Sequence, residues 1–193
     1  MKKAQSTAIY GVFSAVIVIL QLLSYTPLLK IGTFSLSLVL IPIVFGAYLY
    51  GPKAGALFGG VFGAVVIIAC AVGLDAGGAI LFSGNWFLTS VVCMLKGIAA
   101  GYVAGLISRA LKGWNKYVSV MVAAIAAPIV NSGLFSIAMM TVFKETLYTW
   151  AGDTPVLSYV LISLIGVNFL IELVINILFA PSLVKLKKAI NSR

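Results

Sequence analysis

Histidine is absent from the 193-residue sequence, cysteine occurs twice, and charged residues are scarce. Without histidine the chain can hold neither a zinc-protease motif nor a Ser-His-Asp triad. Cys70 and Cys93 lie in apolar runs without metal-ligand spacing, which indicates buried free thiols. A phosphate-cradling GxxxxGK[ST] segment is also absent, so the chain is not expected to hydrolyse ATP itself. These absences predict a protein that is not an enzyme and has no metal site or cofactor.

Charge is the scarcest property of the chain. Charged residues make up 9% of it, against about 25% in soluble domains, while 62% of the residues are hydrophobic. So few charges cannot cover a surface that faces water, and we infer that most of the chain faces lipid. The net charge of +9 comes from short loops and tails, which indicates topology signals and contacts with anionic lipid rather than nucleic acid binding.

Apolar runs of about 20 residues, the length that crosses a bilayer, recur between turn signals along the whole chain. The six predicted helices cover residues 7–25, 34–50, 54–74, 85–111, 117–143 and 156–184. The sequence thus predicts an all-α integral membrane protein, with residues 1–193 forming a single transmembrane domain of six helices. Pro42 and Pro128 fall inside predicted helices, where they produce either gentle kinks or a bend that opens a cavity.

The distribution of basic residues predicts that both termini are cytoplasmic. With the N-terminus inside, ten lysines and arginines fall in cytoplasmic segments, and only Lys30 and Lys144 fall in outer loops. Three of the four acids, namely Asp75, Glu145 and Asp153, also fall outside. Short cytoplasmic loops carry an excess of Lys and Arg, so the opposite orientation is disfavoured.

Small residues recur at four-residue spacing on three predicted helices, and such spacing lets membrane helices approach closely. Two of these faces are expected to pack inside the bundle; they consist of Gly55, Gly59 and Gly63 on the third helix and Gly97, Gly101 and Gly105 on the fourth. The stripe on the first helix faces either its own bundle or a helix of another protein; it consists of Ala4, Ala8, Gly11 and Ala15.

Two charges, Lys96 and Glu172, lie near the middle of predicted membrane helices, where a charge costs about 3 kcal/mol on insertion scales. We expect them to form an ion pair or to share a polar network. The pair would either fix the register of its helices or contact a charged group of a ligand. Asn168 and Asn176 extend a polar stripe through Glu172, and Asn131 adds an amide in the fifth helix.

Aromatic residues gather near amides and acids at the predicted outer side. Trp86 follows Asn85, and Tyr148 and Trp150 precede the sixth helix. Aromatic residues at this level often only anchor a helix at the membrane surface. Flat rings beside a few polar groups are also what a small-molecule pocket needs.

Two stretches of the chain, residues 40–63 (LIPIVFGAYLYGPKAGALFGGVFG) and residues 96–105 (KGIAAGYVAG), are similar to a known family. With its six predicted spans, the chain resembles the substrate-binding S components of bacterial energy-coupling factor (ECF) vitamin transporters. The resemblance implies a multi-pass protein of the bacterial cytoplasmic membrane that captures a vitamin or related micronutrient. It also implies docking on a T component that works with two ATPase subunits.

The resemblance also implies roles for particular residues. Members of the family dock on the T component through an Ala-x-x-x-Ala motif of the first helix, and residues 11–15 (GVFSA) look like this motif, as do Ala4 and Ala8. The family pocket is formed by the outer halves of helices four to six and by the outer loops. By position it corresponds to Asn85, Trp86, Asn131, Tyr148, Trp150, Asn168 and Glu172.

Alternatives remain for the ligand and for the mode of transport. The amides and the two charges would suit pantothenate, whereas the aromatic residues would suit a pterin as in folate, pyridoxine or a deazapurine base of the queuosine-precursor type. A stand-alone secondary transporter of a small polar solute is the main functional alternative. A membrane enzyme or scaffold is a further one, although no catalytic cluster is visible in the sequence.

Overall fold

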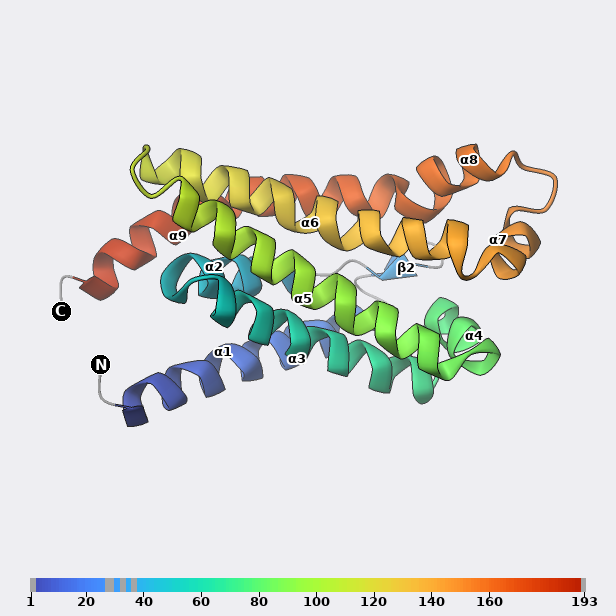
Figure 1. The fold of residues 1–193 in the computed structure, drawn as a ribbon, viewed down its shortest axis with the longest axis horizontal. Helices are drawn as coiled ribbons and strands as arrows, with labels where there is room; N and C mark the ends of the chain where they lie inside the picture. Colours follow the sequence, from blue (N-terminus) through green and yellow to red (C-terminus); the bar gives the residue numbers. More distant parts are fainter. Residues whose placement is uncertain (1–2, 27–29, 32–33, 36–37, 192–193) are drawn as a thin grey trace.

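The computed structural model describes residues 3–26, 30–31, 34–35 and 38–191, without the side chains of residues 3–6, 30–31, 34–35, 163–165, 167–168 and 189–191. Figure 1 shows an elongated bundle in which α1 begins and α9 ends at the same end. The elements are α1 (Lys3–Ser24), β1 (Lys30–Ile31), β2 (Phe34–Ser35), α2 (Leu40–Tyr50), α3 (Pro52–Ala71), α4 (Ala76–Gly84), α5 (Trp86–Ala110), α6 (Lys116–Thr141), α7 (Lys144–Ala151), α8 (Val156–Ser158), the π-helix η2 (Tyr159–Gly166) and α9 (Val167–Asn191).

Within the described residues, five helices contain a stretch long and apolar enough to cross a membrane. These stretches are Thr7–Ser24, Pro52–Ala71, Trp86–Ala110, Lys116–Thr141 and Phe169–Lys188. The sixth apolar helix, α2, has only 11 residues. The all-α membrane fold predicted from the sequence is confirmed.

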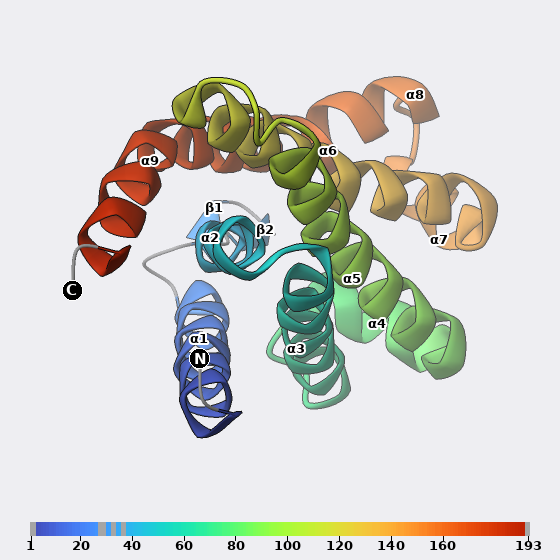
Figure 2. The ribbon, with the colours of Figure 1, turned by 60° about the vertical axis from the view of Figure 1, so that its left-hand side comes forward.

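The second helix begins six residues later than expected, at Leu40 instead of residue 34. Phe34–Ser35 instead pairs with Lys30–Ile31 in a short antiparallel ladder. At about 1.5 Å per residue, α2 is about 16 Å long, roughly half the thickness of a bilayer core. Seven of the eleven residues of α2 are buried and the other four are half-buried. Figure 2 shows α2 at the centre of the bundle, where it contacts α1, α3, α5, α6 and α9.

Two short helices, α4 and α7, occupy segments that the sequence analysis treated as outer loops. The side chain of Asp75 caps α4, since its Oδ1 accepts a hydrogen bond from the Gly78 backbone N–H at 3.0 Å. α7 buries Leu147 and Ala151. Figure 1 shows both helices at the end of the bundle opposite the start of α1.

The glycine faces of α3 and α5 pack directly against each other. A Cβ atom added to Gly59 would collide with the backbone carbonyl of Gly97, and one added to Gly55 would collide with that of Gly101. A Cβ at Gly63 would lie 2.7 Å from the carbonyl oxygen of Cys93. The expected packing of these glycines inside the bundle is therefore confirmed, and it brings the two backbones into contact.

Candidate substrate-binding cavity

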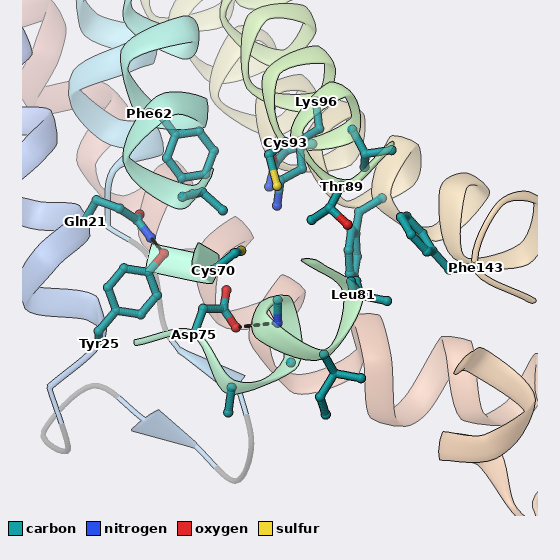
Figure 3. Close-up of a pocket in the computed structure, with 18 of the residues that line it drawn as sticks. Gln21, Tyr25, Phe62, Cys70, Asp75, Leu81, Thr89, Cys93, Lys96 and Phe143 are labelled. Atoms are coloured by element: carbon teal, nitrogen blue, oxygen red, sulfur yellow. Dashed lines mark hydrogen bonds between the residues drawn. The ribbon is translucent and has the colours of Figure 1, made fainter. Parts of the chain in front are cut away.

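A cavity of about 370 Å³ lies beyond the N-terminal end of α2, and Leu40, the first residue of that helix, forms part of its wall. Because α2 has only 11 residues, the space beyond its first turn is bordered by the neighbouring helices. Residues of α1, α3, α4, α5, α6, η2 and α9 line this space, together with Trp150 of α7. Figure 3 shows Gln21 and Tyr25 on one side of it and Thr89 on the other.

The short helices α4 and α7 line the cavity at the predicted outer end. Asp75, Gly77 and Gly78 line it from the start of α4. A Cβ atom at Gly77 would lie 3.7 Å from the ring of Trp150, so the indole packs beside the first turn of α4. The Asp75 carboxylate, which faces the cavity, is held in place by its hydrogen bond to Gly78.

Two buried polar atoms of the cavity wall have no hydrogen-bond partner among the described residues, namely Thr89 Oγ1 and Asn131 Oδ1. Thr89 is 2% exposed and Asn131 is 9% exposed. An unsatisfied buried polar atom costs about 1–3 kcal/mol, so native proteins rarely leave one without a partner. The cavity therefore offers a hydroxyl and an amide oxygen to a ligand or to water.

The cavity wall also carries three residues that are normally charged, two acidic and one basic, namely Asp75, Glu172 and Lys96. The Lys96 ammonium lies 5.0 Å from the ring centroid of Phe135 and 5.8 Å from that of Phe62, which is cation–π distance. The Glu172 side chain is buried. Lys96 and Glu172 thus border the same cavity. The ion pair between these two residues stays a prediction.

The wall opposite α5 adds an amide and a phenol that the sequence analysis did not select. Gln21 Nε2 donates a hydrogen bond to the Tyr25 hydroxyl at 2.8 Å, and both side chains are buried. Thr89 was also missed, although it lies seven residues before Lys96 and therefore on the same face of α5. That spacing was the available signal for Thr89. Gln21 lies on the first helix and Tyr25 directly follows it, and no pocket residue was predicted on that helix.

Some of the residues predicted for the pocket line the cavity, and others do not. Asn131, Trp150 and Glu172 line the cavity, and Lys96 joins them. The side chain of Asn168 lies outside the described residues.

The other three predicted pocket residues are not among the residues that line this cavity, so their contact with a ligand stays a prediction. The side chain of Asn85 caps α5 by accepting a hydrogen bond from the Leu88 backbone N–H at 3.0 Å. Trp86 is 64% exposed and Tyr148 is 61% exposed. Asn85 and Trp86 lie at the start of α5, where capping and interfacial roles do not require a ligand.

The small-residue stripe of α1 faces away from its own bundle. Ala8, Gly11 and Ala15 are exposed, and a Cβ atom at Gly11 would meet nothing within 4 Å. The opposite side of the helix is buried through Ile17 and Gln21. The side chain of Ala4 lies outside the described residues. Of the two orientations considered for this stripe, the structure therefore favours the one that leaves it available to another helix.

Comparison with known families gives one match that covers most of the chain. The model of the ECF transporter, substrate-specific component, matches residues 5–184. No curated protein matches the chain. The matched range includes every residue that lines the cavity, and it includes Ala8, Gly11 and Ala15 of the exposed face of α1.

Proposed function

The chain belongs to the family of ECF transporter substrate-specific components, and from this premise we propose that the cavity beyond α2 captures a vitamin or related micronutrient for import. The observation that carries the proposal is a cavity between the helices that has two unsatisfied buried polar atoms and charges of both signs in its wall. Pockets for small molecules combine an apolar wall with a few such groups. The chain itself is a transport subunit, and partner ATPase subunits would supply the energy.

The size of the cavity narrows the choice among the candidate ligands. Its volume of about 370 Å³ is near the lower end of the 300–1,000 Å³ that is common for ligand pockets. Pantothenate, pyridoxine and a deazapurine base of the queuosine-precursor type fit this volume better than folate, which has a glutamate tail. We propose that Trp150 stacks on or covers the ligand while Thr89 and Asn131 hydrogen-bond to it.

We propose that Lys96, Glu172 and Asp75 select the charged groups of the ligand. A cation and two carboxylates around one small space can pair with a molecule that carries both an acidic and a basic group, or with one charged group and a polar ring. Because the site excludes much of the surrounding solvent, each correct charge contact would discriminate strongly between solutes.

The exposed face of α1 and the distribution of basic residues bear on the partner subunits and on the orientation in the membrane. Docking on the T component would use the exposed face of α1 around Gly11 and Ala15. We propose that both termini lie in the cytoplasm of a bacterial cell, as the distribution of basic residues indicates, and that the cavity opens towards the exterior.

The test begins with the ligand that accompanies the purified full chain. Mass spectrometry after gentle solubilisation is expected to find one small molecule at close to one per chain. Trp150→Ala is expected to weaken binding of that molecule about tenfold, since aromatic contacts and buried area are lost. Trp86→Ala is the matched control, because Trp86 is exposed outside the cavity and should leave affinity unchanged.

Two results would contradict the proposal. Equal affinity of the wild type and Trp150→Ala would place the ligand elsewhere. Uptake of the identified molecule by cells that lack ECF ATPase subunits would instead indicate a stand-alone secondary transporter.

A further inference from the structure

A second concavity lies at the opposite end of the bundle, which the basic residues assign to the cytoplasmic side. Its volume is about 1,140 Å³. The residues that line it include six cations and none of the four acids of the chain. The cations come from α3, α5, α6, α9 and the turn between α5 and α6; they are Lys53, Arg109, Lys112, Lys116, Lys187 and Lys188.

Lys187 is positioned by contacts within the protein. Its Nζ donates a hydrogen bond to the backbone carbonyl of Tyr48 at 3.2 Å and lies 3.8 Å from the centroid of the Tyr48 ring. Lys112 and Lys116 line the same concavity as Lys187. Like charges that converge in this way repel one another unless an anion lies between them.

A buried hydroxyl in the same wall lacks a partner. Ser108 lines the concavity and is 8% exposed, and its Oγ has no hydrogen-bond partner within the described part of the chain. Its backbone carbonyl accepts a hydrogen bond from Ser119 Oγ at 3.2 Å, so the local backbone is fixed. A phosphate oxygen is an acceptor that such a hydroxyl can bind.

The wall of the concavity continues onto the lipid-facing side of α5. Tyr102 and Leu106 line it and are exposed, and both lie within the spanning stretch Trp86–Ala110. A free phosphate ion would make no favourable contact with this apolar margin. A phospholipid would place its headgroup among the cations and its acyl chains along α5. Tyr117 also lines the concavity, at the level where aromatic residues meet lipid headgroups.

We propose that this concavity is a binding site for an anionic phospholipid of the cytoplasmic leaflet. The phosphate of the lipid binds among Lys112, Lys116 and Lys187, and its chains follow Tyr102 and Leu106. Basic pockets between membrane helices on this side of a bilayer recognise such headgroups. The site is separate from the substrate cavity, so the proposal does not depend on the identity of the substrate.

The experiment is native mass spectrometry of the purified full chain titrated with phosphatidylglycerol or phosphatidylcholine. Phosphatidylglycerol is expected to bind at least tenfold more tightly. Lys112→Gln/Lys116→Gln is expected to weaken its binding about fivefold for each lysine removed. Lys185→Gln is the matched control on α9, since Lys185 is exposed and lies outside the concavity. Lys187→Gln provides a second variant, with an expected loss of about fivefold, should the double variant unfold.

Three results would overturn the proposal. Equal affinity for the two lipids would show that the headgroup charge is not recognised. An equal loss in Lys185→Gln would reduce the effect to general surface charge. Displacement of phosphatidylglycerol by inorganic phosphate at equal concentration would reveal a site for free phosphate in place of a lipid.

Discussion

Thr89 and Asn131 present the substrate cavity with polar atoms that the protein itself does not satisfy. Leaving these buried atoms without hydrogen bonds destabilises the ligand-free protein. A ligand that hydrogen-bonds to them removes this destabilisation. Single residues of this wall can therefore affect stability and ligand affinity in opposite directions.

The replacement Thr89→Val tests this reasoning, because valine has nearly the shape of threonine without the hydroxyl. Ligand affinity is expected to fall about tenfold as one hydrogen bond is lost. The thermal midpoint of the empty protein is expected to stay the same or rise, since no unsatisfied hydroxyl remains buried. Binding titrations and thermal unfolding in detergent measure the two effects.

Thr141→Val is the matched control for this prediction. Thr141 is exposed on α6 and its hydroxyl bonds to the Ile137 carbonyl, away from the cavity. The variant Thr141→Val should bind the ligand with the wild-type affinity. A Thr89→Val protein with unchanged affinity would show that the hydroxyl does not contact the ligand.

How far single residues could be assigned from sequence depended on their depth in the membrane. Lys96, Asn131 and Glu172 lie in the middle of apolar runs, where a polar side chain must face the protein interior, so their place around a cavity could be inferred. At the helix ends this constraint disappears. Asn85 and Trp86 had a capping role and an interfacial role available, and composition could not exclude either.

At the scale of elements, hydropathy located the five long helices because bilayer thickness imposes their length. It could not locate the start of α2, since Phe34–Ser35 is apolar enough to extend that helix but instead pairs with β1. It also missed α4 and α7, whose 9 and 8 residues are too few to cross a membrane. The cavity depends on these three short helices, so its outline could not be predicted.

The contact between α3 and α5 supports the cavity wall and yields a prediction for that element pair. In Gly59→Ala the added methyl group would meet the backbone carbonyl of Gly97, which cannot move aside as a flexible side chain can. Overpacking of this kind costs about 1–3 kcal/mol, so the thermal midpoint should fall by several degrees.

Gly133→Ala separates this steric effect from the general effect of replacing a helical glycine. A Cβ atom at Gly133 in α6 meets nothing within 4 Å, and alanine is the better helix former. Its thermal midpoint should stay equal or rise. If Gly59→Ala were as stable as Gly133→Ala, the close approach of α3 and α5 would be refuted.

At the scale of the whole molecule, the two proposed functions of the chain lie on different surfaces. The substrate cavity is enclosed by the bundle, whereas the exposed face of α1 looks away from it. α1 reaches the cavity through Gln21 and exposes Gly11 and Ala15 on its other side. A change on the exposed face can therefore impair coupling to partner subunits without reaching the ligand.

Gly11→Leu is the variant that tests this separation. Space around Gly11 is open within the chain, so leucine fits the isolated protein, but its bulk would keep a partner helix from close approach. Uptake in cells that contain the complete transporter should fall about tenfold or more, while ligand affinity of the purified chain stays the same. Gly133→Leu is the matched control, because Gly133 also has open space but lies on α6. Normal uptake by Gly11→Leu would remove the exposed face of α1 from the docking surface, whereas an equal loss in Gly133→Leu would point to a general effect of bulk in the membrane.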